Sequence, residues 1–548
     1  MSEITFDLIV IGAGINGAGV ARYGAIRGWR VLVLDKGDIA SGTSGASTRL
    51  IHGGLRYLEH GEVHLVRQSL RERDALLRTA PHLVKPLTFL IPIYKGSKRG
   101  RMEINVGLTF YDMLGRKGPL PRHHMLSCDE VLGRVPGLNR VKLVGGAIYF
   151  DAQVEFPERL VVENVITAYQ HGASVRTYSK LDSFRLENGQ IRGVEFTDQT
   201  SGEHVGASAT AVVNAAGPWV DEVLKLAGHP PEPLLGGTKG SHIVVSRFEG
   251  APSDALYVEA EQDRRPFFVI PWNNLYLIGT TDYRFTGDLD NIHAEPFEVE
   301  YLLCETNRLF PQARLQRESV LFTSSGVRPL AFSRESREAR ITRRHFIREH
   351  ESVRGLFSIV GGKLTTYRQV AEETVDLVER RFRLSGALEP GKAAAPRRSH
   401  TLERDLIGAS DFEDFRTHFR EESGLPSHLV ERLLRIYGTR AEEIRTLTRL
   451  TPSLLRVFDP ETGAIAAEVV FAFESEFART LTDCILRRTM VGFNSACGLN
   501  AVQSAGEIAR THLGWSEERV ESDVIQYERH VKRHLRAGLS GGRVPSSQ

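Results

Sequence analysis

Three glycines near the N-terminus have the spacing of a turn that binds a dinucleotide. The segment Gly12-Ala13-Gly14-Ile15-Asn16-Gly17 follows an apolar run from Ile4 to Ile11 and precedes a predicted helix that stops at Gly28. Glycines at this spacing let backbone N–H groups approach a pyrophosphate at a helix N-terminus. Asp35 ends the next apolar run, where it can accept a hydrogen bond from a ribose hydroxyl. The alternative is a tight turn without a ligand. The residues expected to bind the dinucleotide are Gly12, Gly14, Asn16, Gly17, Asp35 and Lys36.

Two later segments are expected to line the same cofactor. The hydroxyl-rich loop Ser41 to Thr48 follows the second apolar run, and Gly361-Gly362-Lys363-Leu364-Thr365-Thr366-Tyr367 leads into a predicted helix from Gln369 to Arg381. A helix N-terminus there would place positive potential beside a flavin ring, where negative charge collects on reduction. An ordinary helix that begins at glycine is the alternative. Because the chain has one GxGxxG turn, no pyridine nucleotide is expected beside a flavin. The further residues expected to contact the cofactor are Thr43, Ser44, Ser47, Gly53, Gly217, Gly362, Lys363, Leu364 and Thr365.

The elements that must position these residues are strands of a parallel sheet. Nearly continuous apolar runs, as at Val31–Leu34, 211–216 and 356–360, are typical of strands buried on both faces. Strands of this kind place the residues that follow them at the carboxyl edge of the sheet, where ligands bind. Alternating runs such as 241–245 and 275–278 predict antiparallel strands of a cap. We therefore expect a discontinuous nucleotide-binding domain at 1–85, 150–235 and 335–390, a substrate or cap domain at 86–149 and 236–334, and a helical domain at 391–548.

Composition narrows the class of protein. A chain of 548 residues is long enough for two or three domains, and its formal charge of +2 argues against a nucleic-acid partner. The four cysteines form no CxxC pair, so neither a redox dithiol nor a structural zinc site is expected, and no other metal site is indicated. The N-terminus lacks a basic region and no apolar stretch is long enough to span a membrane, which predicts a cytoplasmic protein.

Several motifs, taken together, resemble those of the aerobic, FAD-dependent glycerol-3-phosphate dehydrogenases. They occur in the right order from about residue 4 to residue 370, and two of them, Leu50 to Leu58 (LIHGGLRYL) and Gly361 to Arg368 (GGKLTTYR), are much more diagnostic than the glycine turn. The resemblance implies an α/β fold with a Rossmann-like FAD-binding domain of the D-amino-acid-oxidase type, an antiparallel cap domain and a helical C-terminal domain. It also implies a protein at the cytoplasmic face of the membrane that passes electrons to quinone. The other motifs are IVIGAGINGAG from residue 9, NAAGPW from 214, KGSH from 239, IGTTD from 278 and SGVRP from 325.

Three cations in these motifs fit a phosphorylated substrate. Arg56, Arg328 and Lys363 each lie beside glycines in a different segment. Arginine offers a bidentate fork to a phosphate dianion and lysine a point charge. A single arginine is more often a surface ion-pair partner, but three cations placed by separate glycine-rich motifs favour one anionic pocket. We expect these three residues to bind glycerol 3-phosphate.

Oxidation of the secondary alcohol needs a base for the hydroxyl proton while a hydride moves from C2 to the flavin. His52 and His242 have the side chain best suited to that role, and Tyr57 can polarise the oxygen. We favour His52 as the base, with Arg56, Tyr57 and Arg328 as its catalytic partners and His242 as a substrate-binding residue. Either histidine can instead be a hydrogen-bonded structural residue. Cations around the C2 oxygen would also reduce the need for a base.

A basic, partly apolar segment is the candidate for contact with the membrane surface. Residues 95–122 contain seven Lys or Arg against two acids, together with Met102, Phe110 and Met113. Such a segment can lie on an anionic bilayer, and a solvated cap helix is the alternative. The basic tail around 529–536 is a second candidate, which we interpret as a solvated end. The expected partners are glycerol 3-phosphate, a membrane quinone and the membrane surface. A homodimer is also expected as an option, but no sequence segment indicates its interface.

Two rival functions differ from the quinone-linked dehydrogenase. A soluble oxidase would use oxygen on the same substrate and release hydrogen peroxide, and no sequence motif decides between the two acceptors. A flavin-bound non-catalytic partner or an RNA-modification subunit would show an extended basic face with exposed aromatics. The near-neutral charge and the three cationic motifs count against that last class.

Overall fold

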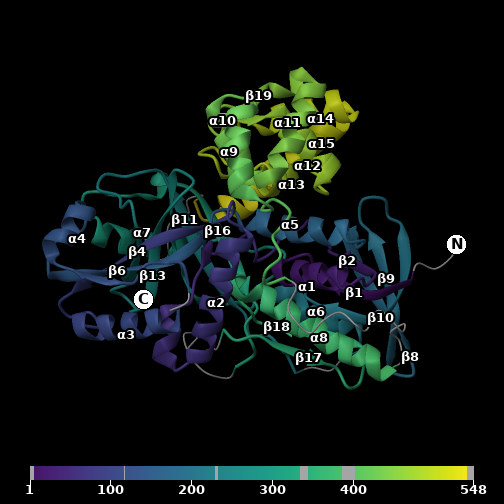
Figure 1. The fold of residues 1–548 in the computed structure, drawn as a ribbon, viewed down its shortest axis with the longest axis horizontal. Coiled ribbons are helices and arrows are strands. Elements are labelled where there is room, and N and C mark those ends of the chain that lie inside the picture. Colours follow the sequence, from purple (N-terminus) through teal and green to yellow (C-terminus); the bar gives the residue numbers. More distant parts are fainter. Residues whose placement is uncertain (1–4, 116–117, 229–231, 334–342, 386–400, 540–548) are drawn as a thin grey trace.

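The computed structural model has two sheets side by side and a group of helices above their junction (Figure 1). A parallel-based sheet with its covering helices forms one side and a larger antiparallel sheet the other. The helices that follow residue 401 pack above helix α5. The structure describes residues 5–115, 118–228, 232–333, 343–385 and 401–539.

The first sheet has eight strands in the order β17-β18-β10-β1-β2-β7, with β9 paired to β10 and β8 to β9. Strands β18, β10, β1, β2 and β7 run parallel, so the expected parallel sheet is confirmed. Its strands are apolar and largely buried because helices cover both faces. The strands span Thr5–Ile11 (β1), Val31–Leu34 (β2), Ser174–Arg176 (β7), Ser179–Glu187 (β8), Gln190–Asp198 (β9), His204–Asn214 (β10), Phe346–Glu349 (β17) and Leu356–Val360 (β18).

Four helices cover this sheet and set the positions of its loops. Helix α1 begins directly after Gly14 and packs between α5 and α8. The helix expected at 369–381 is longer, since α8 begins at Tyr367 and follows a 3-10 turn, η5, at Leu364–Thr366. A 3-10 turn of this kind tightens many helix N-termini. The helices span Ile15–Ile26 (α1), Pro157–Gln170 (α5), Val220–Leu226 (α6) and Tyr367–Ser385 (α8), and a 3-10 turn, η2, lies at Gly217–Trp219.

The second sheet has ten strands in the order β15-β11-β14-β13-β12-β4-β6-β3, with β16 paired to β11 and β5 to β6. All pairs are antiparallel except β4 with β12, which confirms the antiparallel strands expected at 241–245 and 275–278. Strand β3 comes from the range expected in the nucleotide domain, yet it pairs with β6 here. The strands span Leu50–Ile51 (β3), Val84–Tyr94 (β4), His124–Leu126 (β5), Leu143–Val154 (β6), Thr238–Val245 (β11), Ala255–Glu259 (β12), Pro266–Trp272 (β13), Leu275–Gly279 (β14), Tyr283–Arg284 (β15) and Val320–Arg328 (β16).

The helices around this second sheet connect its strands and continue into the substrate side of the protein. After β3 the chain forms a 3-10 turn that carries Arg56 and Tyr57, and α2 follows it. The elements span Leu55–His60 (η1), Val63–Thr79 (α2), Arg101–Leu114 (α3), Cys128–Arg134 (α4), Pro296–Leu309 (α7) and Arg317–Ser319 (η3).

The C-terminal helices, α9 to α15, share one hydrophobic core with the antiparallel sheet. The spacing of Leu429, Leu433, Ile436 and Tyr437 predicts one apolar face of a helix, and all four side chains are buried on α10. Val469, Phe473, Phe477 and Leu481 recur at four-residue spacing, which predicts one helix across all four. That prediction is wrong, because α12 ends at Ser475 and Phe477 adopts a left-handed backbone. The helices span Phe412–Glu422 (α9), Ser427–Tyr437 (α10), Ala441–Leu450 (α11), Ala466–Ser475 (α12), Leu481–Asp483 (α13), Val502–Leu513 (α14) and Glu517–His530 (α15); the shorter elements are Gly438–Arg440 (η7), Pro452–Leu455 (η8), Val457–Asp459 (β19), Ala464–Ile465 (β20), Cys484–Arg488 (η9), Val491–Phe493 (η10), Val531–Leu535 (η11) and Ala537–Leu539 (η12).

Candidate active site

A cavity of about 1180 Å³ lies at the carboxyl edge of the parallel sheet. Strand β1 lies between β10 and β2, and all three end at this cavity. This is the place where doubly wound sheets bind their ligands. The volume exceeds that of an ordinary drug-sized site, which suits an extended dinucleotide. The expected cofactor residues on its wall are Gly12, Gly14, Asn16, Asp35, Lys36, Thr43, Ser44, Ser47, Gly217, Gly362, Lys363 and Leu364.

The glycine turn is built for close backbone approach. Gly12 has a φ of +105°, and a Cβ there would lie 2.6 Å from the Ala215 carbonyl oxygen. Gly14, as the N-cap of α1, offers no side chain to the helix N-terminus, and the Ile15 N–H donates to Ser44 Oγ at 3.0 Å. Gly14, Ile15 and Asn16 all line the cavity, so the N-terminus of α1 faces it, and an anion is stabilised at such a place.

Asp35 supports the turn as well as facing the cavity. Its carboxylate accepts hydrogen bonds from the Ala13 N–H at 2.6 Å and the Gly37 N–H at 2.8 Å. Burial raises the pKa of Asp35, and the two backbone bonds oppose that rise. Lys36 instead points to the cap side, where its Nζ lies 2.6 Å from Asp290 Oδ1.

Two observations test whether the cavity fits FAD. The Asn16 Oδ1 atom is buried without a hydrogen-bond partner among the described residues, although it lies on the cavity wall. Gly217 has a φ of +58°, and a Cβ there would meet no atom within 4 Å, so this wall is open to a ligand. A buried polar atom of this kind needs a partner, and a dinucleotide in the cavity would provide one. The residues present thus fit the cofactor.

Three of the expected cofactor residues do not line the cavity. Gly17 packs against the turn, since a Cβ there would lie 1.9 Å from the Gly12 carbonyl oxygen. Gly53 packs closely against Tyr111, whose hydroxyl would lie 2.4 Å from a Cβ at this position. The Thr365 hydroxyl accepts a hydrogen bond from the His52 N–H at 3.2 Å. Their contribution lies in shaping the walls.

Four cations gather around Tyr57 at the end of the cavity where Lys363 lies. The Lys363 Nζ is 4.5 Å from the centre of the Tyr57 ring and 3.1 Å from Ser69 Oγ. Arg56, Arg328 and Arg343 all lower the pKa of Tyr57 against the effect of its burial, which raises it. The structure therefore brings together the three cations singled out in the sequence, although they come from η1, β16 and the segment before η5.

Asp282 orients two of these cations. Its carboxylate lies 3.1 Å from Arg328 Nη1 and 3.2 Å from Arg343 Nη2. Arg328 also donates to Thr280 Oγ1 at 3.0 Å. The Arg343 Nη1 atom is buried without a partner among the described residues. With both guanidinium groups on one carboxylate, the remaining Arg343 donor is available to an anion.

Burial changes the acid–base properties of this cluster. It lowers the pKa of Lys363 to about 7, although Asp151 and Glu62 oppose the change. It also lowers the pKa of His52 to about 3, with Lys363 and Arg73 adding to the effect. His52 is therefore neutral near pH 7, and the low pKa makes its ring a weak base in the free enzyme.

The two histidines differ in accessibility. His242, on β11, is 2% exposed, and its Nε2 lies 2.9 Å from Thr48 Oγ1. Its pKa is lowered to about 3 by burial and then by Arg328. His52 is half-buried, and no hydrogen bond of its ring is found among the described residues. Neither ring lines the large cavity itself, and both lie beside the cation cluster.

Sequence reasoning missed two parts of this site. Arg343 and Asp282 carried no signal beyond the IGTTD motif, which contains Asp282. The C-terminal helices were not expected at the cofactor site at all, yet they contribute to the cavity wall. The interpretation of 529–536 as a solvated end holds only for the exposed side chains of Arg529, Lys532 and Arg533, because Val531 is buried and the chain returns to β16 at Leu535. The C-terminal residues on the wall are Leu486, Arg487, Phe493, His530, His534 and Leu535.

Comparison with known proteins agrees with this geometry. The family model described as FAD dependent oxidoreductase matches residues 7–368, which is most of the chain. The chain belongs to the FAD-dependent oxidoreductase family. A second model, the C-terminal domain of alpha-glycerophosphate oxidase, matches residues 399–520. The flavin fold with a helical C-terminal part and the FAD cofactor expected from the sequence are thereby confirmed.

Relatives of this FAD-dependent oxidoreductase align over nearly the whole chain. A glycerol-3-phosphate dehydrogenase of Synechocystis is 44% identical over 97% of this chain and 98% of its own. An aerobic glycerol-3-phosphate dehydrogenase of Staphylococcus epidermidis is 31% identical over 96% and 94%. The solved glycerol-3-phosphate dehydrogenase of Bacillus halodurans, complexed with FAD, superposes with a TM-score of 0.79 at 28% identity, covering 97% and 96%. The resemblance inferred from the motifs is confirmed.

Proposed function

We propose that the protein oxidises sn-glycerol 3-phosphate to dihydroxyacetone phosphate with FAD and passes the electrons to a membrane quinone. The observation that carries this proposal is the group of Arg56, Arg328, Arg343 and Lys363 around Tyr57, beside the cofactor cavity. Such a group suits a phosphate dianion attached to a small alcohol. The relatives from Synechocystis and Staphylococcus epidermidis are named as glycerol-3-phosphate dehydrogenases, which supports this substrate.

Each side chain has a defined task in this proposal. Arg328 and Arg343, oriented by Asp282, bind the phosphate together with Arg56. Tyr57 and Lys363 hold the C2 hydroxyl, and His52 takes its proton. Bound FAD supplies the hydride acceptor, so the C2–H bond breaks as the C2=O bond forms. The loss of one hydride and one proton balances the oxidation of the alcohol to the ketone.

An anaerobic titration tests the function directly. Glycerol 3-phosphate should bleach the visible flavin absorption of the purified holoenzyme, while glycerol and amino acids should leave it unchanged. A flavin that stays oxidised with glycerol 3-phosphate would contradict the substrate assignment. Adding a quinone analogue or oxygen to the bleached enzyme then separates the dehydrogenase from the alternative oxidase, which would reoxidise rapidly in air and release hydrogen peroxide.

The charge of Lys363 should give the reaction a specific pH dependence. With a pKa of about 7 in the free enzyme, Lys363 is protonated below that pH and loses its charge above it. We therefore expect kcat/KM for glycerol 3-phosphate to fall about tenfold per unit as the pH rises beyond about 7. Steady-state kinetics across pH 5.5 to 9.5 would measure this fall.

A matched variant identifies the titrating group. Lys363→Arg keeps a charge that does not titrate in this range, so its alkaline fall should move upward by more than one unit. Lys363→Gln should be slow throughout and show no fall near pH 7. An unchanged alkaline limb in both variants would assign the pKa to another group.

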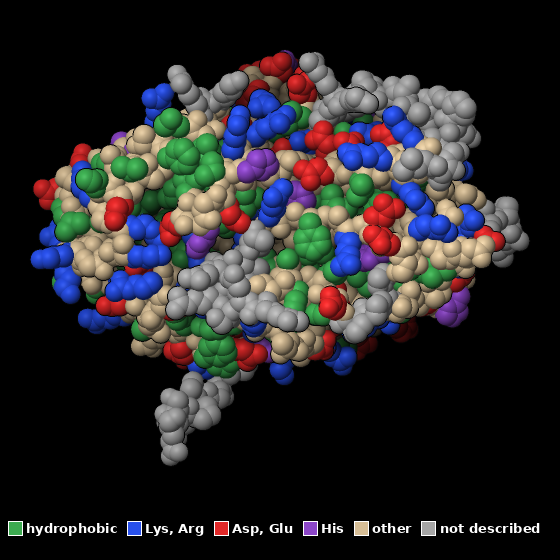
Figure 2. Space-filling model, turned by 90° about the horizontal axis from the view of Figure 1, so that it is seen from below, with side chains coloured by type: hydrophobic (Ala, Val, Ile, Leu, Met, Phe, Trp, Pro, Cys, Tyr) green, Lys and Arg blue, Asp and Glu red, His purple; other side chains and the backbone are tan. Residues whose placement is uncertain are grey.

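Helix α3 presents an apolar face that fits the proposed contact with the membrane. Its side chains Met102, Val106, Phe110 and Met113 are 74%, 62%, 41% and 65% exposed, whereas Leu108 on the opposite face is buried. Their spacing places them on one side of the helix. Figure 2, which views the molecule from below, shows hydrophobic side chains next to Lys and Arg over its left part, on the side of the antiparallel sheet. No helix among the described residues is long and apolar enough to cross a membrane.

Replacing this face should release the protein from lipid. The triple variant Met102→Ser, Val106→Ser, Phe110→Ser should bind vesicles containing anionic lipid at least about tenfold more weakly, because buried apolar area supplies much of such binding. Vesicle flotation measures the effect. Leu450→Ser is the control, since Leu450 is 77% exposed on α11 in the C-terminal helices. Equal binding of the triple variant and the wild type would contradict the assignment.

A further inference from the structure

The C-terminal helices meet the cofactor cavity at two unusual turns. One is η9 at Cys484–Arg488 and the other η11 at Val531–Leu535, and both are π-helical. π-Helical turns are rare in proteins and occur often at functional sites, because the widened turn redirects side chains. Side chains of both turns, or directly beside them, line the cavity.

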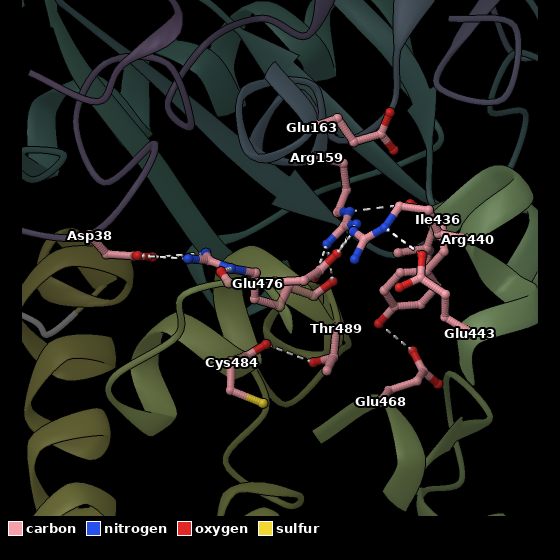
Figure 3. A network of polar contacts seen from close by, with 12 residues as sticks. Asp38, Arg159, Glu163, Ile436, Arg440, Glu443, Glu468, Glu476, Cys484 and Thr489 are labelled. Atoms are coloured by element: carbon pink, nitrogen blue, oxygen red, sulfur yellow. Dashed lines mark hydrogen bonds and ion pairs between the residues drawn. The ribbon is translucent and has the colours of Figure 1, made fainter. Parts of the chain in front are cut away.

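The first turn holds the loop that follows Asp35. Asp38 is fully buried, and its carboxylate lies 2.6 Å from Arg487 Nε and 2.8 Å from Arg488 Nη2. Figure 3 shows Asp38 at the left of the polar network, on the side away from Arg440, with dashed lines running from it into the network. Burial raises the pKa of Asp38, but the two guanidinium groups outweigh it and lower that pKa, so the aspartate is ionised. Gly37, directly before Asp38, and Ala40, two residues after it, belong to the cavity wall.

A second buried network anchors the same turn to helix α5. Arg159 of α5 binds Glu476 through both guanidinium nitrogens, at 2.5 and 2.7 Å, and Arg440 binds the same carboxylate. Figure 3 shows these side chains converging between α5 and the C-terminal helices. Burial would raise the pKa of Glu476, yet Arg159 and Arg440 lower it to about 2. Because Arg488 donates to the Glu476 carbonyl at 2.7 Å, the two networks are continuous.

The second turn forms a wall of the cavity. His530 and His534 lie one helical turn apart with ring centres 4.7 Å from each other, and both line the cavity. His534 Nδ1 lies 3.0 Å from the carbonyl oxygen of Ile292, which also belongs to the wall. Thr323 of β16 donates to the Leu535 carbonyl at 3.0 Å. The chain thus returns from the helices to the cap sheet beside the cavity.

We propose that the C-terminal helices are part of the FAD site. In this arrangement Arg487 and Arg488 position the loop from Asp35 to Ala40, and His530 contacts bound FAD from the opposite wall. Removing a partner from a buried ion pair leaves an uncompensated charge, which would displace the loop. Since binding linkage is reciprocal, FAD should in turn stabilise the docking of these helices. The inference rests on the assignment of the cavity to FAD.

Measurements of FAD affinity test the positioning role. Arg487→Gln should raise the dissociation constant for FAD at least about tenfold in reconstitution of the apoprotein, followed by flavin fluorescence, and should speed FAD release from the holoenzyme. Arg487→Lys, which keeps the charge next to Asp38, should recover most of the affinity. Leu433→Ala is the control for general loss of stability, because this fully buried side chain lies in the core of the C-terminal helices. An unchanged dissociation constant in Arg487→Gln, or an equal loss in Leu433→Ala, would overturn the proposal.

The wall contact has a separate test with a partly exposed residue. His530→Ala should shift the visible flavin spectrum and weaken FAD binding several-fold, while His418→Ala on the exposed surface of α9 should change neither. Hydrogen exchange should slow across 484–493 and 530–535 when FAD binds the apoprotein. Identical exchange with and without FAD would overturn the inference. Gly14→Val tests the assignment of the cavity to FAD separately from the role of the C-terminal helices. If this variant retains wild-type FAD affinity, the assignment of the cavity to FAD is wrong.

Discussion

Replacement of Arg328 by alanine should lower kcat/KM for glycerol 3-phosphate about 100-fold, chiefly through KM, while the bound flavin keeps its spectrum. A charge-assisted hydrogen bond contributes about 1.5 to 3 kcal/mol, and the upper value corresponds to roughly 100-fold. The side chain of Arg328 is held toward Tyr57 by Asp282 and Thr280. It does not line the cofactor cavity, so the flavin should be unaffected. Steady-state kinetics and the visible spectrum of the purified variant measure both effects.

Two comparisons sharpen this result. Arg328→Lys should remain impaired, because a lysine cannot keep the fork between Asp282 and Thr280 while binding phosphate. Arg317→Ala removes a cation from an ion pair with Glu300 outside the site and should be neutral. Loss of flavin from a folded Arg328→Ala protein would remove the substrate-binding role proposed for this residue.

Replacement of His52 by glutamine should slow flavin reduction by about 100- to 1000-fold at saturating glycerol 3-phosphate. General base catalysis contributes effects of this size. Burial, with Lys363 and Arg73 nearby, lowers the pKa of His52 to about 3, so the ring is neutral and free to take the proton, but a pKa this far below 7 makes it a weak base in the free enzyme. Glutamine retains hydrogen bonding but cannot accept the proton. Anaerobic stopped-flow absorbance gives the reduction rate, separate from the substrate dissociation constant.

The control for His52 is the second histidine. His242→Gln should keep the reduction rate within about tenfold, because its ring is buried in the sheet and bonded to Thr48. Any effect on substrate binding predicted for His242 should appear in the dissociation constant instead. A rate reduced less than tenfold in His52→Gln would show that the cations stabilise an alkoxide without a dedicated base.

Much of the cofactor site is readable from local sequence. The turn at Gly12 must contain glycine because its φ is positive and the Ala215 carbonyl lies against it. Asp35 ends a buried strand, so its carboxylate necessarily lies at the sheet edge where the turn also lies. Both features follow from a strand, a tight turn and a helix that are adjacent in the chain. This is why the residues found on the cavity wall agree closely with those expected.

The tertiary structure decided which distant groups meet. Arg56, Arg328 and Lys363 were singled out one by one, but their convergence on Tyr57 depends on the order and register of strands far apart in the sequence. Arg343 joins them because Asp282 binds it, and no local pattern announces that contact. Conversely, Thr365 was expected at the cofactor, yet its hydroxyl pairs with the His52 backbone. The orientation of a side chain on an irregular turn is set by its packing, which the sequence pattern does not contain.

The C-terminal helices show this division most clearly. Their apolar stripes are periodic, so the sequence by itself determined that they form a helical core. The helix expected through Phe477 ends early, where Glu476 becomes the partner of Arg159 from α5. Buried ion pairs between segments more than 300 residues apart leave no periodic signal, because each partner is a single charged residue in its own stretch of chain. The sequence therefore determined the elements and the cofactor turn, and only the packed structure decided that the last helices enclose the same cavity.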